Sequence, residues 1–148
     1  MVIFLDTGPL GAIVNPKPKV FAIINWYNAM IAAGHRFKVP AIADFEVRRE
    51  LTRINAIKSL AALDSFNAAP DVYLPLTDSA LKLAARWWAH ARNTGQPTAH
   101  TNELDCDVII AAQASDFGLP PADYVIATVN VGHLSRFVPA QTWSTIAP

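Results

Sequence analysis

Acidic side chains stand beside apolar segments at three places in the chain, and carboxylates in such places could do chemistry. They are Asp6, the pair Glu46 and Glu50, and the group Glu103, Asp105 and Asp107. Carboxylates that meet in one hollow favour hard divalent cations, which reverse the sign of the local field, acidify a bound water and stabilise a leaving oxygen. These residue types therefore indicate metal-assisted hydrolysis of a phosphodiester, provided that the fold brings them together.

Asp6 follows the uninterrupted apolar run 2–5 and precedes Gly8 and Pro9. In an open parallel α/β sheet, ligands bind outside the carboxyl ends of the strands, so an acid in this place faces a site. Asp before Gly-Pro is also ordinary turn chemistry, in which the carboxylate caps a helix that begins near Pro9. The sequence leaves both interpretations open.

Glu46 and Glu50 lie on the margin of an amphipathic helix expected over 42–54. Either glutamate could reach inward to the sheet edge, and either could instead form a solvated pair with an arginine three residues later. The apolar stripe of this helix, spaced i, i+4, i+8 and i+11, consists of Ala43, Val47, Leu51 and Ile54. This spacing does not choose between the two glutamates.

The third acidic group opens a strongly apolar helix expected over 103–118. Acids in a first turn are favoured by the helix dipole, typically by about 0.3–1 kcal/mol, so part of this group has a purely structural explanation. Three acids exceed what capping requires. A carboxylate buried beside Ile109 and Ile110 would need a charge partner, and a metal ion is one such partner.

Strands alternate with helices along the chain. Short β-rich runs predict strands, and the longer amphipathic runs between them predict helices. We expect strands over 2–5, 36–40, 72–76 and 123–128, a fifth over 142–146, and helices after Gly8 and over 20–33, 42–54, 56–69, 77–93 and 103–118. This alternation predicts the α/β class, as a three-layer α/β/α sandwich with a central parallel sheet.

The totals restrict the classes of function. A chain of 148 residues with 52% hydrophobic content predicts a single domain over 1–148 with one core. Twelve basic and twelve acidic residues cancel, so any nucleic-acid binding must come from a local surface. A lone Cys106, no secretory signal pattern and no apolar run of about 20 residues predict a cytoplasmic protein without a membrane span.

Four segments together resemble the motifs of the PIN-domain ribonucleases, in particular the VapC-type toxins and their solitary bacterial relatives. In chain order the segments are "VIFLDTGPLG", "VPAIADFEVRRELTR", "LDCDVIIAAQASDFGL" and "VIATVNVGHLSRF". The resemblance implies a flavodoxin-like, PIN-like sandwich whose acidic pocket holds one or two Mg²⁺ or Mn²⁺ ions. It also implies that Asp6, Glu46 and Asp107 are the catalytic and metal-binding acids.

A fourth position departs from the commoner pattern of that family. Asn130 stands after the fourth strand, and His133 stands three residues later, where the resemblance would place an Asp. Asparagine offers a carbonyl oxygen but no negative charge. Asp105 could compensate only if the helix begins after it, because residues i and i+2 otherwise point to nearly opposite sides. Thr7, Thr128 and Asn130 are expected to orient the ligands.

The resemblance further implies endonucleolytic cleavage of single-stranded RNA that leaves a 3′-hydroxyl, and it implies a protein antitoxin as partner. Trp87 and Trp88 lie on a helix with a broad apolar arc, so one of them could face an antitoxin or a second copy in a homodimer, unless the helix is packed on two sides. Basic residues near the acids could hold the RNA backbone or could simply be solvated. These are Arg48, Arg49 and Arg53, with Lys17, Lys19, Arg36 and Lys38 on neighbouring segments.

Two other functions fit parts of the pattern. A catalytically weak PIN-like module that binds RNA or protein would tolerate Asn130 and His133. A phosphoacceptor receiver domain also gathers aspartates at parallel strand ends, but it needs a lysine after the last such strand, and no lysine follows "VIATVN". We therefore expect an Mg²⁺- or Mn²⁺-dependent endoribonuclease, with the binding module as the alternative.

Overall fold

A five-stranded parallel sheet forms the centre of the molecule, in a computed structural model that describes residues 1–15, 21–94 and 101–148, the side chains of 101–104 excepted. The strand order is β3-β2-β1-β4-β5, and every neighbouring pair is parallel. The strands are β1 (Val2–Leu5), β2 (Arg36–Pro40), β3 (Tyr73–Leu74), β4 (Tyr124–Thr128) and β5 (Ala140–Thr142). The predicted α/β class with a parallel sheet is confirmed.

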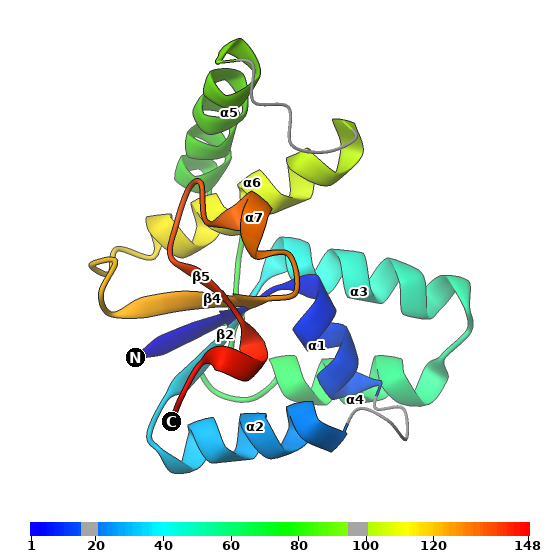
Figure 1. Ribbon diagram of the computed structural model, residues 1–148. Helices are drawn as coiled ribbons and strands as arrows, with labels where there is room; N and C mark the ends of the chain where they lie inside the picture. The colour runs from blue at the N-terminus through cyan, green and yellow to red at the C-terminus, as the bar shows by residue number, and fades with distance from the viewer. Residues whose placement is uncertain (16–20, 95–100) are drawn as a thin grey trace.

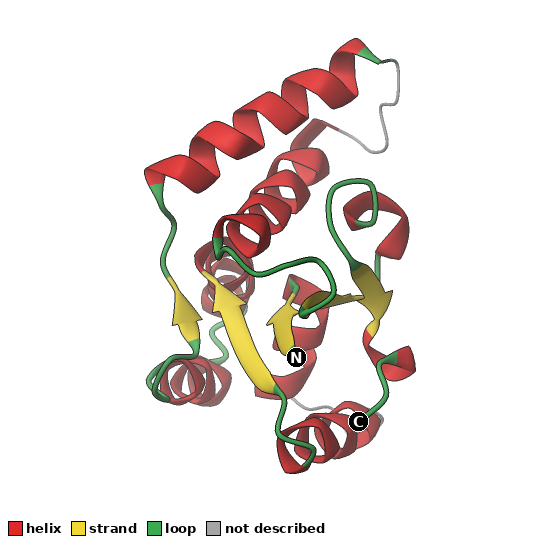
Figure 2. Ribbon diagram, turned by 90° about the vertical axis from the view of Figure 1, so that its left-hand side faces the viewer, coloured by secondary structure: helices red, strands yellow, loops and turns green. Residues whose placement is uncertain are grey.

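Helices cover both faces of this sheet. Figures 1 and 2 both show α5 and α6 above the strands and α2 below them, which makes three layers. The α-helices in the described residues are α1 (Thr7–Val14), α2 (Phe21–Ala32), α3 (Ala41–Arg53), α4 (Ile57–Asn67), α5 (Asp78–Asn93), α6 (Thr101–Asp116) and α7 (Val131–Leu134). Each parallel strand pair needs such a crossover, because its strands enter the sheet from the same edge.

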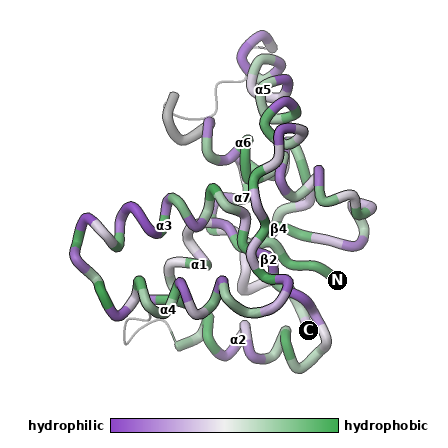
Figure 3. The backbone as a smooth tube through the Cα atoms, turned by 180° about the vertical axis from the view of Figure 1, so that it is seen from behind, coloured by the Kyte–Doolittle hydropathy of each residue, from purple (hydrophilic) through white to green (hydrophobic). Residues whose placement is uncertain are grey.

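The core lies around β1, whose four residues are all buried. A strand that is covered on both faces has no solvent side, which explains its uninterrupted apolar sequence. Phe4 packs edge-to-face against Phe117 from one side and Tyr124 from the neighbouring strand, with ring centroids 5.6 Å apart in both cases. Figure 3 shows the same division, with hydrophobic colour on the central strands and hydrophilic colour along much of α3.

Two strand predictions were wrong in their extent. The third strand is two residues long instead of 72–76, because Pro75 has no N–H to donate to a ladder. The fifth strand is Ala140–Thr142, and residues 143–145 form a 3₁₀ turn instead of continuing it. Trp143 in that turn packs against Trp26, with ring centroids 5.7 Å apart, and this contact draws the chain off the sheet edge.

The predicted stripe of α3 is buried at Ala43, Val47 and Leu51, whereas Ile54 at its end is 49% exposed. No helix in the described part of the chain is both long and apolar enough to cross a bilayer. Lys17, Lys19 and the expected helix start at residue 20 lie outside the described residues.

Candidate active site

Asp6 stands at the carboxyl end of β1 and is 6% exposed. Its Oδ1 accepts a hydrogen bond of 2.7 Å from the backbone N–H of Thr7, and it is the N-cap of α1. Its Oδ2 accepts a hydrogen bond of 2.6 Å from the hydroxyl of Thr128, the last residue of the adjacent strand β4. Asp6 therefore caps the helix, as one interpretation of the sequence predicted, and it also stands at the carboxyl ends of β1 and β4, where the other interpretation requires it.

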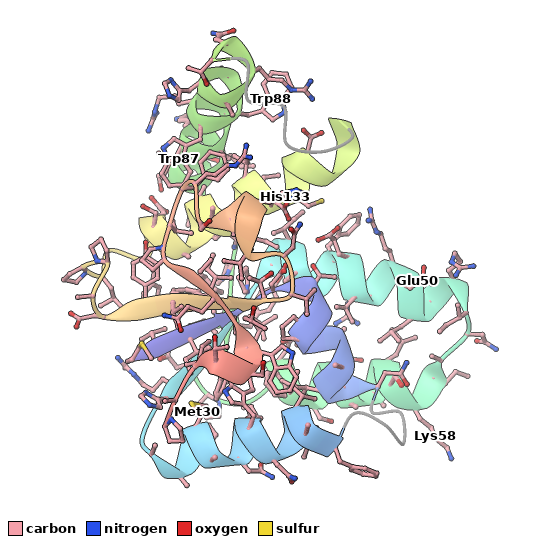
Figure 4. The ribbon with its side chains drawn as sticks, in the orientation of Figure 1. Met30, Glu50, Lys58, Trp87, Trp88 and His133 are labelled. Atoms are coloured by element: carbon pink, nitrogen blue, oxygen red, sulfur yellow. The ribbon has the colours of Figure 1, made fainter. Side chains whose placement is uncertain are left out.

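Glu46 is the glutamate of α3 that turns toward the strand ends. The Thr7 hydroxyl donates to Glu46 Oε2 at 2.7 Å, and Arg49 Nη2 donates to Oε1 at 3.2 Å. The Glu46 side chain is 17% exposed, whereas that of Glu50 is 55% exposed and pairs with Arg53. Figure 4 shows Glu50 far along α3, away from the sheet. The structure therefore places Glu46, and not Glu50, near the strand ends, which the helical spacing alone did not decide.

Asp107 reaches the same region from α6. Its side chain is 14% exposed, and its Oδ2 lies 3.0 Å from Nδ1 of His133 on α7, a residue labelled in Figure 4. The same His133 nitrogen lies 2.7 Å from Nδ2 of Asn130. The backbone N–H of Asn130 in turn donates to the Thr128 hydroxyl at 2.8 Å. A chain of contacts therefore runs from Asp6 through Thr128, Asn130 and His133 to Asp107.

The three carboxylates act on one another electrostatically. Burial is the main cause that raises the pKa of Asp6; the charge of Glu46 raises it further, while hydrogen bonds from Thr128 and Thr7 oppose the rise. Burial, and then the charge of Asp6, raise the pKa of Asp107 to about 6, with His133 opposing and Glu46 adding to the rise. Negative charge thus accumulates here at neutral pH, at a cost that a proton or a cation would relieve.

The chemistry of these donors suits a hard divalent cation, because such ions take carboxylate and amide oxygens. Among the described residues, no group of three or more His, Cys, Asp and Glu side chains stands close enough to hold a metal ion as it is. Burial, with a smaller contribution from charge repulsion, raises the pKa of Asp6 and Asp107, and a bound cation would offset both costs by attracting the carboxylates. The residues therefore fit a cation by their charge and ligand type, although they do not form a closed cage.

Asp105 does not compensate for the missing fourth acid. It is exposed, and its Oδ1 accepts a hydrogen bond of 2.8 Å from the indole N–H of Trp88 on α5. Because α6 begins at Thr101, Asp105 and Asp107 are both within the helix and about 200° apart around its axis. The expectation that Asp105 could share the site of Asp107 was therefore wrong.

Among the described residues, most members of the predicted basic rim lie away from the acidic cluster. Of the three arginines on α3, only Arg49 bonds to a cluster acid. Arg48 donates to Asp44 at 2.9 Å and to Asp64 at 2.8 Å, and Arg53 pairs with Glu50. Arg48 and Arg53 are thus engaged with carboxylates outside the cluster.

The two basic residues of β2 also lie away from the acidic cluster. Lys38 is 2% exposed, and its ammonium bonds to the backbone and side-chain oxygens of Asp71. Arg36 is the first residue of β2 and pairs in register with Val2, so it lies at the amino end of the sheet. The carboxyl ends, where the acids gather, are at the opposite edge.

A cleft of about 440 Å³ lies beside the cluster, between α1 and α3. The residues that line it include Thr7, Gly11, Glu46, Val47, Glu50 and Leu51. The approach of α1 to α3 that forms this cleft is not visible in the sequence. Gly11, whose missing Cβ would lie 3.8 Å from Val47, is the one local signal of it.

Cys106 on α6 is a half-buried neighbour of the cluster. Burial, followed by the charge of Glu46 and a hydrogen bond to it, raises the pKa of the Cys106 thiol to about 12. A thiol with so high a pKa is a poor nucleophile. On α5, Trp87 stacks on Phe137 with centroids 5.5 Å apart, while Trp88 is 38% exposed.

Comparison with known proteins gives likeness in structure only. No protein-family model and no curated protein matches the sequence. A chain of VapBC-1 from nontypeable Haemophilus influenzae matches with a TM-score of 0.70 and 19% identity, over 98% of this chain and 100% of that chain. A chain of FitAcB from Neisseria gonorrhoeae matches with a TM-score of 0.70 and 20% identity, over 97% and 99%.

A third similar structure is DNA-bound VapBC from Salmonella typhimurium, with a TM-score of 0.70, 19% identity and coverage of 97% of this chain and 98% of that chain. At these identities the likeness establishes a shared fold over nearly the whole length of both chains. This likeness agrees with the α/β architecture that the strand order shows directly.

Proposed function

We propose that this chain is a metal-dependent endoribonuclease of the VapC toxin type, which cleaves single-stranded RNA. The observation that carries the proposal is the convergence of Asp6, Glu46 and Asp107, from β1, α3 and α6, at the carboxyl ends of the central strands. Burial and neighbouring carboxylates raise the pKa of Asp6 and Asp107, and groups with pKa values perturbed in this way are enriched at functional sites.

We assign three roles to this site: holding the metal ion, directing the carboxylates and admitting the RNA strand. Asp6, Glu46 and Asp107 would hold Mg²⁺ or Mn²⁺, which when bound supplies charge neutralisation and an acidified water. Thr7 bonds to Glu46 and Thr128 bonds to Asp6, so these hydroxyls fix the direction of each carboxylate. The cleft between α1 and α3 opens beside Glu46 and gives an RNA strand access to the acids.

The similarity in fold to chains of VapBC and FitAcB supports this proposal. We assign the chain to the toxin instead of to its antitoxin partner, because the acidic cluster is what phosphodiester hydrolysis requires. A protein partner follows from this assignment. The exposed Trp88, with Leu81 and Ile109 beside it, offers an apolar surface for that partner or for a second copy of the chain.

Cleavage of end-labelled single-stranded RNA with Mn²⁺ tests the proposal, and two matched pairs of variants control it. Glu46→Gln should abolish cleavage while Glu50→Gln on the same helix should not. Asp107→Asn should abolish cleavage while Asp105→Asn, two residues away, should not. Equal activity within either pair would contradict the assignment of the site.

The alternative, a PIN-like module that binds RNA or protein without cleaving it, is favoured by one observation. Asn130 and His133 stand near Asp107, at positions where an acid would add negative charge for the binding of a metal ion. RNA binding that persists with EDTA, with no cleavage in Mg²⁺ or in Mn²⁺, would establish this alternative and overturn the nuclease.

A further inference from the structure

Phe45 is a large aromatic residue on α3 that lies exposed one position before Glu46. It is 53% exposed. It stands two residues from both Ala43 and Val47 of the buried stripe, and therefore about 200° around the helix axis from Val47. Packing against the core of the molecule thus does not account for a phenyl ring at this position.

Arg49 connects this ring to the acidic cluster. Its guanidinium carbon lies 5.5 Å from the centre of the Phe45 ring, and its Nη2 donates to Glu46 Oε1 at 3.2 Å. Around the helix axis, Arg49 lies about 40° from Phe45 and, on its other side, about 60° from Glu46. The ring, the guanidinium and the carboxylate therefore form a continuous strip from the solvent face of α3 to the edge of the cluster.

An exposed ring beside a cation matches the two parts of an unpaired nucleotide. Proteins that bind single-stranded nucleic acid stack bases on aromatic side chains and attract the phosphates with basic ones. Phe45 remains 53% exposed with the guanidinium over its ring, so it keeps surface for a base. The guanidinium of Arg49 has five N–H donors and uses one of them on Glu46, which leaves others for a phosphate oxygen.

We propose that Phe45 stacks on an unpaired base of a single-stranded RNA whose backbone passes Arg49 on its way to the acids. The negative charge of the RNA backbone complements Arg49, which favours a nucleic acid over an apolar peptide segment as the occupant of this strip. Bases in a duplex are covered by their neighbours on both faces, so this contact selects a single strand. The inference rests on the proposed function, because it names how the substrate is held beside the same site.

Fluorescence anisotropy of a labelled single-stranded RNA tests this proposal without any measurement of activity. The titrations use Asp107→Asn protein with EDTA, so that no RNA is cut. Adding Phe45→Leu, which keeps an apolar side chain but loses the ring, should weaken binding about tenfold or more, and Phe45→Trp should retain it. Phe21→Leu is the matched control, because Phe21 is 63% exposed on α2, below the sheet in Figure 1, and should not change the affinity.

Two further measurements distinguish stacking on a base from an indirect effect through Arg49. The first is a series of RNAs with one base removed at a time: one position should cost the Phe45 protein affinity and cost Phe45→Leu nothing more, because both changes remove the same contact. The second is the slope of log affinity against log salt, which Phe45→Leu should leave unchanged, since no phosphate contact is lost. A shallower slope would mean that Phe45 only holds Arg49 in place and would overturn the stacking.

A loss of fold would not imitate the expected result. Phe45 is exposed and lies opposite the buried stripe, so Phe45→Leu should keep the urea midpoint of the parent protein. An unchanged RNA affinity in Phe45→Leu would overturn the proposal. If the same variant also resisted relief of growth arrest by a neighbouring gene's product, the ring would contact a protein partner instead of RNA.

The outcomes separate the inference from the function on which it rests. Cleavage of RNA by the wild-type protein in Mn²⁺, with equal RNA affinity of Phe45→Leu and its parent, would overturn the stacking and leave the nuclease standing. Coupled losses at Phe45 and at one base, without cleavage in Mg²⁺ or in Mn²⁺, would support the stacking and overturn the nuclease. The absence of both RNA binding and cleavage would overturn both.

Discussion

The hydroxyl of Thr7 donates a 2.7 Å hydrogen bond to Glu46 Oε2 and thereby joins the first turn of α1 to the middle of α3. The same residue donates its backbone N–H to Asp6. A single threonine thus contacts two of the three acids that we assign to the site, one through its backbone and the other through its side chain. Their relative placement depends on it.

Replacing Thr7 by valine removes only the hydroxyl, because the two side chains have nearly the same shape. We expect RNA cleavage to fall at least tenfold, since Glu46 loses the donor that directs it, while the free energy of unfolding falls by about 1 kcal/mol. Thr52→Val is the matched control, because Thr52 bonds to a backbone oxygen on the exposed face of α3. Urea unfolding and a cleavage assay measure the two effects; full activity in Thr7→Val would contradict the role of its hydroxyl.

Asp107→Asn should make the metal-free protein more stable at pH 7. The folded-state pKa of about 6 lies above the ordinary value of 3.8, so the folded protein binds this proton more tightly than the unfolded chain does. The contribution of Asp107 to stability is therefore present below about pH 4 and is lost as the pH rises to about 6. After screening by solvent, the loss is roughly 1–2 kcal/mol.

Unfolding in urea with EDTA, from pH 4.5 to 7.5, measures this effect as the difference between wild type and Asp107→Asn. The difference should grow with pH and level off above the folded pKa. Asp105→Asn should follow the wild type, because Asp105 is exposed on the other side of α6. A wild type that gains stability relative to Asp107→Asn as the pH rises would contradict the raised pKa.

Asp6→Asn should fold with nearly wild-type stability and lose RNA cleavage. The asparagine keeps an oxygen that can accept from the Thr7 backbone, and its amide can donate to the Thr128 oxygen, so the cap survives. The substitution also removes the buried charge that raises the pKa of Asp6. Thermal unfolding with EDTA measures the first effect; severe unfolding would mean that Asp6 serves mainly as a cap.

Much of the fold can be predicted from the sequence, because local patterns determine it. The apolar run 2–5 gives a doubly covered strand, and the acid that follows it must stand at the sheet edge. The face of a helix on which an acid lies is harder to predict, because it depends on where the helix begins. Asp105 illustrates this: a start at Thr101 places it on the far side of α6 from Asp107.

Contacts between residues that are far apart in the sequence cannot be predicted from residue spacing. Lys38 is a basic residue between two apolar residues of β2, and it could have faced the RNA. It is buried because Asp71, 33 residues later, sits in a turn with φ of 62° and supplies both a carboxylate and a backbone oxygen to its ammonium. In the same way, the choice of Glu46 over Glu50 depends on Thr7, which is 39 residues away.

Arg49 is the arginine of α3 that we expect to contact RNA. It is 58% exposed and bonds to Glu46, so its charge lies at the mouth of the site. Arg49→Gln should weaken binding of single-stranded RNA and reduce the slope of log affinity against log salt by about 0.7, the value for one phosphate contact. Arg53→Gln should change neither quantity, because Arg53 is held by the exposed Glu50 away from the cluster. Equal effects of the two variants, measured by fluorescence anisotropy in catalytically inactive Glu46→Gln protein, would contradict a specific role for Arg49.

Expression of this chain in a bacterial host should arrest growth if it is a toxin that degrades RNA. The arrest should require the acids, so induction of Asp6→Asn or Glu46→Gln should leave growth unchanged, while Glu50→Gln should arrest it as the wild type does. Co-expression of a neighbouring gene's product should relieve the arrest if an antitoxin binds the chain. Trp88 is the exposed aromatic residue on the α5–α6 surface, and Trp88→Ala should weaken that relief without removing toxicity. Growth curves after induction, with immunoblots to equalise protein levels, measure each effect; arrest by Glu46→Gln at equal expression would show that the toxicity does not come from the acidic site.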